Sequence, residues 1–282
     1  PFGVRVPIGH VEAGLRSHDR NNPFPEEANR LIIDQISDLM FVPTKTSCRN
    51  LEREGFPRSR IFITGNTVID ALRQSLRRTG GAMSCCRSSR GRKLVLVTLH
   101  RRESFGRTFK GILRALRRTV EENRDIFIVY PVHPNPNVSI PAREMLKHPR
   151  IRLIDPLPYL QFLELMANSD LVVTDSGGVQ EEAPALNKTV LVLREKTERS
   201  EAVAAGCARL IGTNHSDIVR ELKLSMSGLC ETKRKCANIY GDGKASERIS
   251  SIILNHFYPE KHRLPAEFIR DITLKDIEER DA

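Results

Sequence analysis

The chain has 282 residues, enough for two domains of ordinary size. Its 45 Lys and Arg residues against 35 Asp and Glu residues give a formal net charge of +10, so an anionic substrate or partner is expected. A hydrophobic content of 39% excludes general disorder, and no apolar run approaches the ~20 residues that span a bilayer. The first residues also lack the features of a signal peptide. We therefore expect a globular cytoplasmic protein without membrane contact.

Short apolar runs rich in β-branched residues alternate with amphipathic stretches along the chain. The apolar runs predict strands at 5–9, 38–43, 60–65, 93–98, 125–130, 151–155, 170–175 and 189–194. Helical patterns lie at 25–36, 44–55, 105–122, 158–169, 177–186 and 245–256. Continuous apolar strands separated by helices are typical of parallel sheets covered on both faces. The predicted fold class is α/β with two doubly wound, Rossmann-like domains, whose ligands lie at the carboxyl ends of the strands.

The strands fall into two groups, separated by a Gly-, Ser- and Arg-rich segment at 79–92 that we interpret as a linker. Residues 1–78 hold three predicted strands, too few for a complete domain, so the N-terminal domain is expected to be incomplete. Residues 93–244 form the second domain. A helix at 245–256 is expected to cross back to the first domain, and the tail 257–282 has no assigned role.

One block of the chain supplies all of the excess positive charge. From Arg73 to Arg118 there are fourteen Lys or Arg residues and one acid, Glu103. Such a block can bind phosphate or nucleic acid, or it can be a solvated linker followed by the exposed face of a helix. With no Trp and four Tyr in the chain, nucleic-acid binding is not expected.

The six cysteines show neither CxxC pairs nor the spacing of metal ligands. They are Cys48, Cys85, Cys86, Cys207, Cys230 and Cys236. This pattern is typical of a reduced protein, so neither a disulfide nor a metal site is predicted.

Two strand ends carry residues suited to binding phosphate. The run LVVTDSGGVQEEAP places Ser176, Gly177 and Gly178 between a buried strand and a helix, with Glu182 farther along that helix. Free N–H groups at such a turn bind phosphate, and a carboxylate can accept hydrogen bonds from ribose hydroxyls. The alternative is that Ser176 caps the helix and the glycines only make the turn.

The run KLVLVTLHRRESFG places a histidine and arginines at the end of another strand. His100 can act as an acid or base there, and Arg101 can hold a diphosphate. The alternative is a capping histidine with solvated arginines.

In GHVEAGLRSHDRNNPFPEEANR, Glu12 lies at a strand end and Glu26 at a helix start, so the two suit general acid–base chemistry. Alternatively, Glu26 is an ordinary first-turn acid.

Seven motifs occur in order: HVEAGLR, PFPEEANR, ITGNTVIDAL, HRRESFG, YPVHPNPNV, TDSGGVQEEAP and ERSEAVAAG. From Val6 to about Ile253 the chain thereby resembles the non-hydrolysing UDP-N-acetylglucosamine 2-epimerase family, relative to which it is N-terminally truncated. The resemblance implies a GT-B-like pair of domains, with residues 93–244 binding UDP, and a homodimer. It also implies a cytoplasmic isomerase for polysaccharide biosynthesis, which interconverts UDP-GlcNAc and UDP-ManNAc by elimination and re-addition of UDP, with no cofactor and no metal.

The resemblance also assigns roles to the candidate residues. Glu12 and Glu26 match the acid–base carboxylates, and His100 matches the histidine beside the sugar and diphosphate, with Arg101 next to it. The nucleotide contacts are implied to be Phe162 at uracil, Glu182 at ribose, and Ser176, Gly177, Gly178 and Arg199 at the phosphates. His133 belongs to a family motif as well.

Four positions depart from the family pattern, namely Leu99, Leu157, Thr189 and Ser200, where the family usually has Gly, Gln, Pro and Pro. Leu99 matters most, because a glycine there would allow a positive φ or a close approach to diphosphate. Two other functions stay open: a hydrolysing epimerase that releases ManNAc and UDP, and a UDP-binding remnant without catalysis.

Overall fold

The computed structural model describes residues 6–77, 91–227, 236 and 238–263. Contacts divide the chain into a first unit, Pro1–Arg73 with Tyr240–Ala282, and a second unit, Gln74–Ile239. Most of the predicted linker and of the C-terminal tail lies outside the described residues. Among the described residues, no helix has both the length and the apolar character needed to cross a bilayer.

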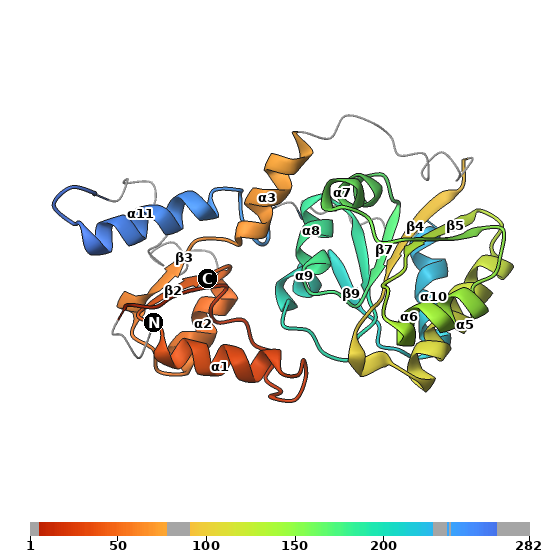
Figure 1. Ribbon diagram of the computed structural model, residues 1–282, viewed down its shortest axis with the longest axis horizontal. Coiled ribbons are helices and arrows are strands. Elements are labelled where there is room, and N and C mark those ends of the chain that lie inside the picture. The colour runs from red at the N-terminus through yellow and green to blue at the C-terminus, as the bar shows by residue number, and fades with distance from the viewer. Residues whose placement is uncertain (1–5, 78–90, 228–235, 237, 264–282) are drawn as a thin grey trace, which may run out of the picture. The chain divides into compact units, whose positions relative to one another are not determined.

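The first unit is built on a three-stranded parallel sheet in the order β1-β2-β3 (Figure 1). Its strands are β1 (Gly9–Val11), β2 (Leu39–Val42) and β3 (Ile61–Ile63), and its helices are α1 (Glu26–Ile36), α2 (Lys45–Arg53), a 3-10 turn (Arg58–Arg60), α3 (Thr67–Leu76, which runs into the second unit) and α11 (Ala245–Phe257). The strand predicted at 5–9 begins instead at Gly9. Pro7 has no N–H for a sheet ladder, and the Ile8 N–H donates to the Asp38 carboxylate at 2.8 Å.

The all-apolar strand β2 is buried because both faces of this sheet are covered. Met40 and Val42 pack with Cys48 and Leu51 of α2. On the other face, Leu39 and Phe41 pack with Ile249 and Ile252 of α11 to form one hydrophobic cluster. The C-terminal helix is therefore part of the first unit.

The second unit has a six-stranded, all-parallel sheet in the order β6-β5-β4-β7-β8-β9. Its strands are β4 (Lys93–Thr98), β5 (Ile126–Pro131), β6 (Ile151–Ile154), β7 (Leu171–Thr174), β8 (Thr189–Val192) and β9 (Ala208–Leu210). If these six strands are numbered 1 to 6 along the chain, their order across the sheet is 3-2-1-4-5-6. This is the Rossmann order, and it confirms the predicted fold class. The strand order reverses between β4 and β7, which pair from Val95↔Leu171 to Thr98↔Thr174.

Helices cover both faces of this sheet (Figure 1). They are a 3-10 turn (Arg102–Ser104), α5 (Arg107–Glu122), α6 (Pro136–Met145), α7 (Tyr159–Ala167), α8 (Val179–Ala185), α9 (Ser200–Ala204) and α10 (His215–Met226). In Figure 1, α5, α6 and α10 lie on one side of the sheet and α7, α8 and α9 on the other. Five elements lie outside the ranges predicted from the sequence, namely α3, α6, α9, α10 and β9.

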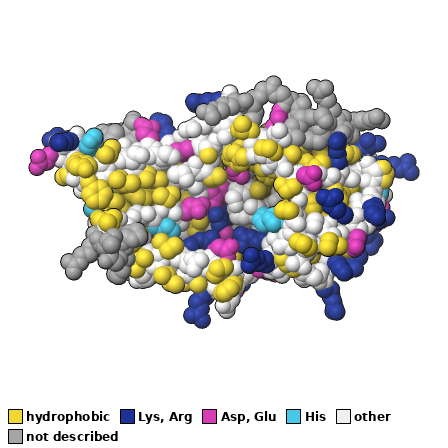
Figure 2. Space-filling model, viewed as in Figure 1, with side chains coloured by type: hydrophobic (Ala, Val, Ile, Leu, Met, Phe, Trp, Pro, Cys, Tyr) yellow, Lys and Arg dark blue, Asp and Glu magenta, His cyan; other side chains and the backbone are white. Residues whose placement is uncertain are grey.

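The basic block belongs partly to α5. Arg107, Lys110, Arg114 and Arg118 are exposed on this helix, and Figure 2 shows Lys and Arg side chains over the end of the second unit where α5 lies. Arg117 and Arg118 pair with Glu121 and Glu122 at 2.7 and 2.6 Å, one turn farther along the same helix. These intrahelical pairs are those of a solvated helix face.

Cys207 and Cys236 form a disulfide, with their Cα atoms 6.0 Å apart. The prediction that all cysteines are reduced is therefore wrong for this pair. The two residues are 29 positions apart in the sequence, but the fold brings Cys207, before β9, and Cys236, after α10, within bridging distance. Cys48 is free and buried, and Cys85, Cys86 and Cys230 lie outside the described residues.

Candidate functional site

Glu12 lies directly after β1 on a turn with an unusual main-chain conformation. Its φ is +68°, a left-handed value that residues other than glycine seldom adopt. Its half-buried carboxylate accepts a hydrogen bond from Asn66 Nδ2 at 2.6 Å. The next residue, Ala13, donates its N–H to the Phe41 carbonyl at 3.2 Å. These contacts fix the main chain and the side chain, so the Glu12 carboxylate is held in one position.

A buried ionic network lies beneath this turn. The Asp34 carboxylate of α1 contacts His10 Nδ1 and Arg16 Nη2, each at 2.6 Å, and the Gly14 N–H at 3.4 Å. Arg16 also binds both carboxylate oxygens of Glu54, at 2.7 Å each. Burial alone would raise the pKa of Asp34, but the hydrogen bonds from His10 and Arg16 outweigh it and lower that pKa. The network ties α1 and α2 to the segment that carries Glu12.

Replacing Asp34 by asparagine is expected to destabilise the protein by about 3 kcal/mol at pH 7, because it leaves the buried Arg16 with one carboxylate in place of two. The folded-state pKa of Asp34 is lowered, so its stabilisation is complete above the unfolded pKa of about 3.9 and is lost as the pH falls through the folded value. The difference between wild type and Asp34→Asn should therefore shrink below about pH 4.

Urea denaturation at a series of pH values measures this difference. Asp217→Asn is the matched control, since Asp217 pairs with Arg220 at 2.8 Å on the surface of α10. It should change the free energy of unfolding by less than about 0.5 kcal/mol. An Asp34→Asn variant as stable as this control would contradict the prediction.

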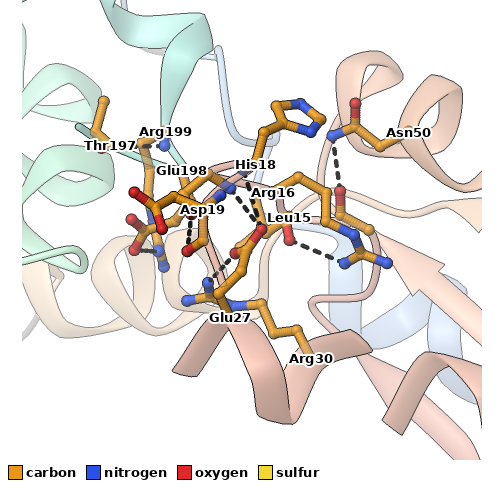
Figure 3. Close-up of polar contacts among 12 residues, drawn as sticks. Leu15, Arg16, His18, Asp19, Glu27, Arg30, Asn50, Thr197, Glu198 and Arg199 are labelled. Atoms are coloured by element: carbon orange, nitrogen blue, oxygen red, sulfur yellow. Dashed lines mark hydrogen bonds and ion pairs between the residues drawn. The ribbon is translucent and has the colours of Figure 1, made fainter. Parts of the chain in front are cut away.

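Two neighbouring acids at the start of α1, Glu26 and Glu27, lie in different environments; Figure 3 shows Glu27 beside His18 and Arg30. Glu26, the predicted acid–base residue, is the first residue of the helix and is exposed. Glu27 is 1% exposed and accepts hydrogen bonds from the Ser17 and His18 N–H groups at 2.9 and 3.1 Å. It also pairs with Arg30 at 3.2 Å. Glu27 thus fixes the preceding loop, whereas Glu26 lies exposed at the start of α1.

In the second unit, Asp175 joins the ends of β4 and β7. One of its carboxylate oxygens accepts the N–H groups of His100 and Arg101, at 2.9 Å each, and the other lies 3.5 Å from His100 Nδ1. The Asp175 carbonyl accepts a hydrogen bond from Arg101 Nε at 3.1 Å. Burial raises the pKa of Asp175. The sequence pattern had shown Asp175 only as a strand end, yet it orients the predicted histidine.

The substitution of Leu99 for the family glycine is accommodated by the core. Leu99 is 1% exposed, is not among the residues with positive φ, and packs in the main hydrophobic cluster. The Tyr130 hydroxyl donates to the Leu99 carbonyl at 2.7 Å, which holds the main chain just before His100. The ring of His100 stacks on that of His133, with 5.8 Å between ring centroids. The structure therefore brings His100, Arg101 and His133 together.

The Ser-Gly-Gly turn follows β7 at the same edge of the sheet. Ser176 does not cap the helix: α8 begins after Gly178, without a side-chain cap, and the Ser176 N–H instead donates to Thr174 Oγ1 at 2.9 Å. A Cβ atom on Gly177 would lie 3.1 Å from Arg199 Nη1. A side chain at Gly177 would therefore press on the Arg199 guanidinium, which would have to shift by a few tenths of an ångström.

Arg199 is buried between carboxylates (Figure 3). Its Nε binds Glu181 at 2.7 Å, and its Nη1 contacts Glu198. Glu198 also pairs with Arg194 at 3.1 Å. With 6% of its surface exposed, Arg199 forms part of a compensated ionic cluster under the Ser-Gly-Gly turn.

Glu182 and Phe162 come from neighbouring helices. Glu182 of α8 is 6% exposed and accepts a hydrogen bond from the Tyr159 hydroxyl at 2.6 Å. Phe162 is half-buried, one turn after Tyr159 on α7. Burial raises the pKa of Glu182, and the hydrogen bond from Tyr159 partly offsets this. Tyr159 is a further candidate that the sequence did not single out.

The described residues contain no group of three or more His, Cys, Asp or Glu side chains placed to hold a metal ion. The candidate chemistry is built from two sets of side chains. In the first unit these are Glu12 and Glu26, and in the second the groups around His100 and the Ser-Gly-Gly turn.

Comparison with known proteins places this arrangement in a family. The family model described as UDP-N-acetylglucosamine 2-epimerase matches residues 2–254. The UDP-N-acetylglucosamine 2-epimerase of Escherichia coli O157:H7 is 48% identical over 266 residues, which cover 90% of this chain and 71% of that protein. A putative enzyme of the same name from Thermotoga maritima is 46% identical over 263 residues, covering 91% and 69%.

Solved structures agree with this match. The S. aureus MnaA–UDP structure superposes with a TM-score of 0.87 at 42% identity, covering 91% of this chain and 69% of that one. The Neisseria meningitidis UDP-GlcNAc 2-epimerase bound to UDP-GlcNAc gives 0.83 at 38% identity, covering 90% and 71%. The chain thus belongs to the UDP-N-acetylglucosamine 2-epimerase family of isomerases, whose GT-B-like fold it shares.

Proposed function

We propose that the protein converts UDP-GlcNAc to UDP-ManNAc by inverting C2 of the sugar. The observation that carries the proposal is the bridge made by Asp175, which holds His100 and Arg101 beside the Ser-Gly-Gly turn where the strand order reverses. In an open parallel sheet this is where nucleotides bind. The relatives from N. meningitidis and Methanocaldococcus jannaschii are named as complexes with UDP-GlcNAc, which supports the same substrate here.

In the proposed reaction, a carboxylate removes the proton from C2 as the C1–O bond breaks and UDP leaves with its electron pair. The intermediate is 2-acetamidoglucal. UDP then adds back to C1, and a proton reaches C2 from the opposite face. Glu12 and Glu26 are the proposed base and acid, because a carboxylate can take up and release a proton without a cofactor. Negative charge grows on the leaving UDP, and His100, Arg101 and main-chain N–H groups stabilise it.

The remaining nucleotide contacts are assigned to the second unit. Ser176, Gly177 and Gly178 are proposed to bind the phosphates, Glu182 the ribose and Phe162 the uracil. Arg199 is proposed to act on the phosphates through the turn that it supports, since Glu181 and Glu198 already neutralise its guanidinium. We further propose a cytoplasmic homodimer that supplies ManNAc nucleotide for surface polysaccharide.

A proton NMR time course of the purified chain with UDP-GlcNAc in D₂O tests the function. The expected product is UDP-ManNAc that carries deuterium at C2, because the abstracted proton exchanges with solvent. Free ManNAc and UDP would instead indicate the hydrolysing reaction. An unchanged spectrum from folded protein would contradict catalysis and leave a UDP-binding remnant.

A further inference from the structure

Tyr159 contacts a residue of the proposed nucleotide site although it belongs to none of the motifs that identified that site. It is the first residue of α7, which lies beside α8 (Figure 1), and its hydroxyl is 2.6 Å from Glu182 Oε1. The Glu182 side chain is buried, whereas Tyr159 is 42% exposed. The pair therefore extends from the interior of the second unit to its surface.

The hydrogen bond leaves part of the Glu182 carboxylate available to a ligand. An ionised carboxylate has about four lone-pair positions, and the Tyr159 hydroxyl occupies one of them on Oε1. Oε2 can then accept a hydroxyl of a ribose. A carboxylate with one oxygen fixed loses less side-chain entropy on binding than a freely rotating one. Its contact with the ligand therefore contributes more to the affinity.

We propose that Tyr159 is a positioning residue that orients the Glu182 carboxylate toward the ribose 2′-hydroxyl and so makes the site selective for ribonucleotides over 2′-deoxyribonucleotides. This inference rests on the proposed function, because it takes Glu182 as the ribose contact. Burial raises the pKa of Glu182 and the Tyr159 hydrogen bond opposes that rise, so the hydroxyl also favours the ionised, accepting form of the carboxylate.

Calorimetric titration of the full chain with UDP and with 2′-deoxy-UDP tests the inference without requiring turnover. Tyr159→Phe removes only the hydroxyl. It should weaken UDP binding about fivefold and 2′-deoxy-UDP binding less than about twofold, which reduces the preference for the ribonucleotide. In a Glu182→Gln background, Tyr159→Phe should change UDP affinity less than about twofold, because two residues that act through one contact are not additive.

Tyr258→Phe is the matched control, since Tyr258 is an exposed tyrosine just after α11 in the first unit, and it should bind both nucleotides as wild type does. Equal weakening of UDP and 2′-deoxy-UDP by Tyr159→Phe would mean a purely structural role and overturn the inference alone. Unchanged or tighter UDP binding would overturn it too. A wild-type chain that binds no UDP would overturn both the inference and the proposed function.

Discussion

Glu12→Gln is expected to lower kcat for C2 epimerisation about 10²- to 10⁴-fold, the usual contribution of a positioned acid–base group. The amide keeps the size of the side chain but cannot take up a proton. Asn66 still holds it, with the amide oxygen in place of Oε1, and the main chain keeps its supports from Phe41 and Asp34. The loss should therefore be chemical, with UDP affinity within about twofold of wild type because Glu12 is not a proposed nucleotide contact.

Initial rates by NMR and UDP titration by calorimetry separate chemistry from binding. Glu247→Gln provides the control, since Glu247 is an exposed acid in the first turn of α11 and should leave both quantities unchanged. If Glu12→Gln turned over within tenfold of wild type, Glu12 would not be the base. The same measurement on Glu26→Gln would then decide whether the other carboxylate has that role.

The elements that the sequence predicted well are those whose own residues determine them. Each apolar β-branched run from 93–98 onward forms a strand within two residues of its predicted bounds, because a strand covered on both faces needs apolar residues throughout. Helix α6 was missed because Pro136 and Pro141 suggest a loop, although a proline in the first turn suits a helix. The strand order and the Cys207–Cys236 pair depend on contacts between distant segments, which a single sequence does not reveal.

The candidate site shows the same division. Motifs pointed to Glu12, Glu26 and His100, but not to the residues that hold these groups in place. Asp175 stood at the end of a predicted strand beside the Ser-Gly-Gly turn, and that position was a usable signal. Asn66 is 54 residues from Glu12, and Tyr159 is 23 residues from Glu182, so their hydrogen bonds appear only in the folded chain.

Gly14→Ala is expected to lower the free energy of unfolding by at least about 4 kcal/mol, the largest loss among the proposed substitutions. It should also disturb the turn that presents Glu12. Gly14 has a φ of +75°, and an added Cβ would lie 2.9 Å from the Ser47 carbonyl carbon and closer still to its oxygen. Both are main-chain atoms of α2, so no side chain can move aside. Either α2 or the turn must shift, and the Gly14 carbonyl, which accepts from Asn50 Nδ2 at 2.9 Å, shifts with it.

Gly14→Ala is destabilising for two reasons, the positive φ and the clash of the added Cβ with α2. Gly55→Ala separates them. Gly55 has a φ of +87°, but no atom lies within 4 Å of its added Cβ, so this variant bears only the main-chain cost of about 1–2 kcal/mol. Urea denaturation followed by circular dichroism should show the Gly14 variant at least twice as destabilised as the Gly55 variant. Equal losses would mean that the turn and α2 relax freely, and the rigid presentation of Glu12 would then need another explanation. The larger loss would show that close packing against α2 keeps Glu12 in its left-handed conformation.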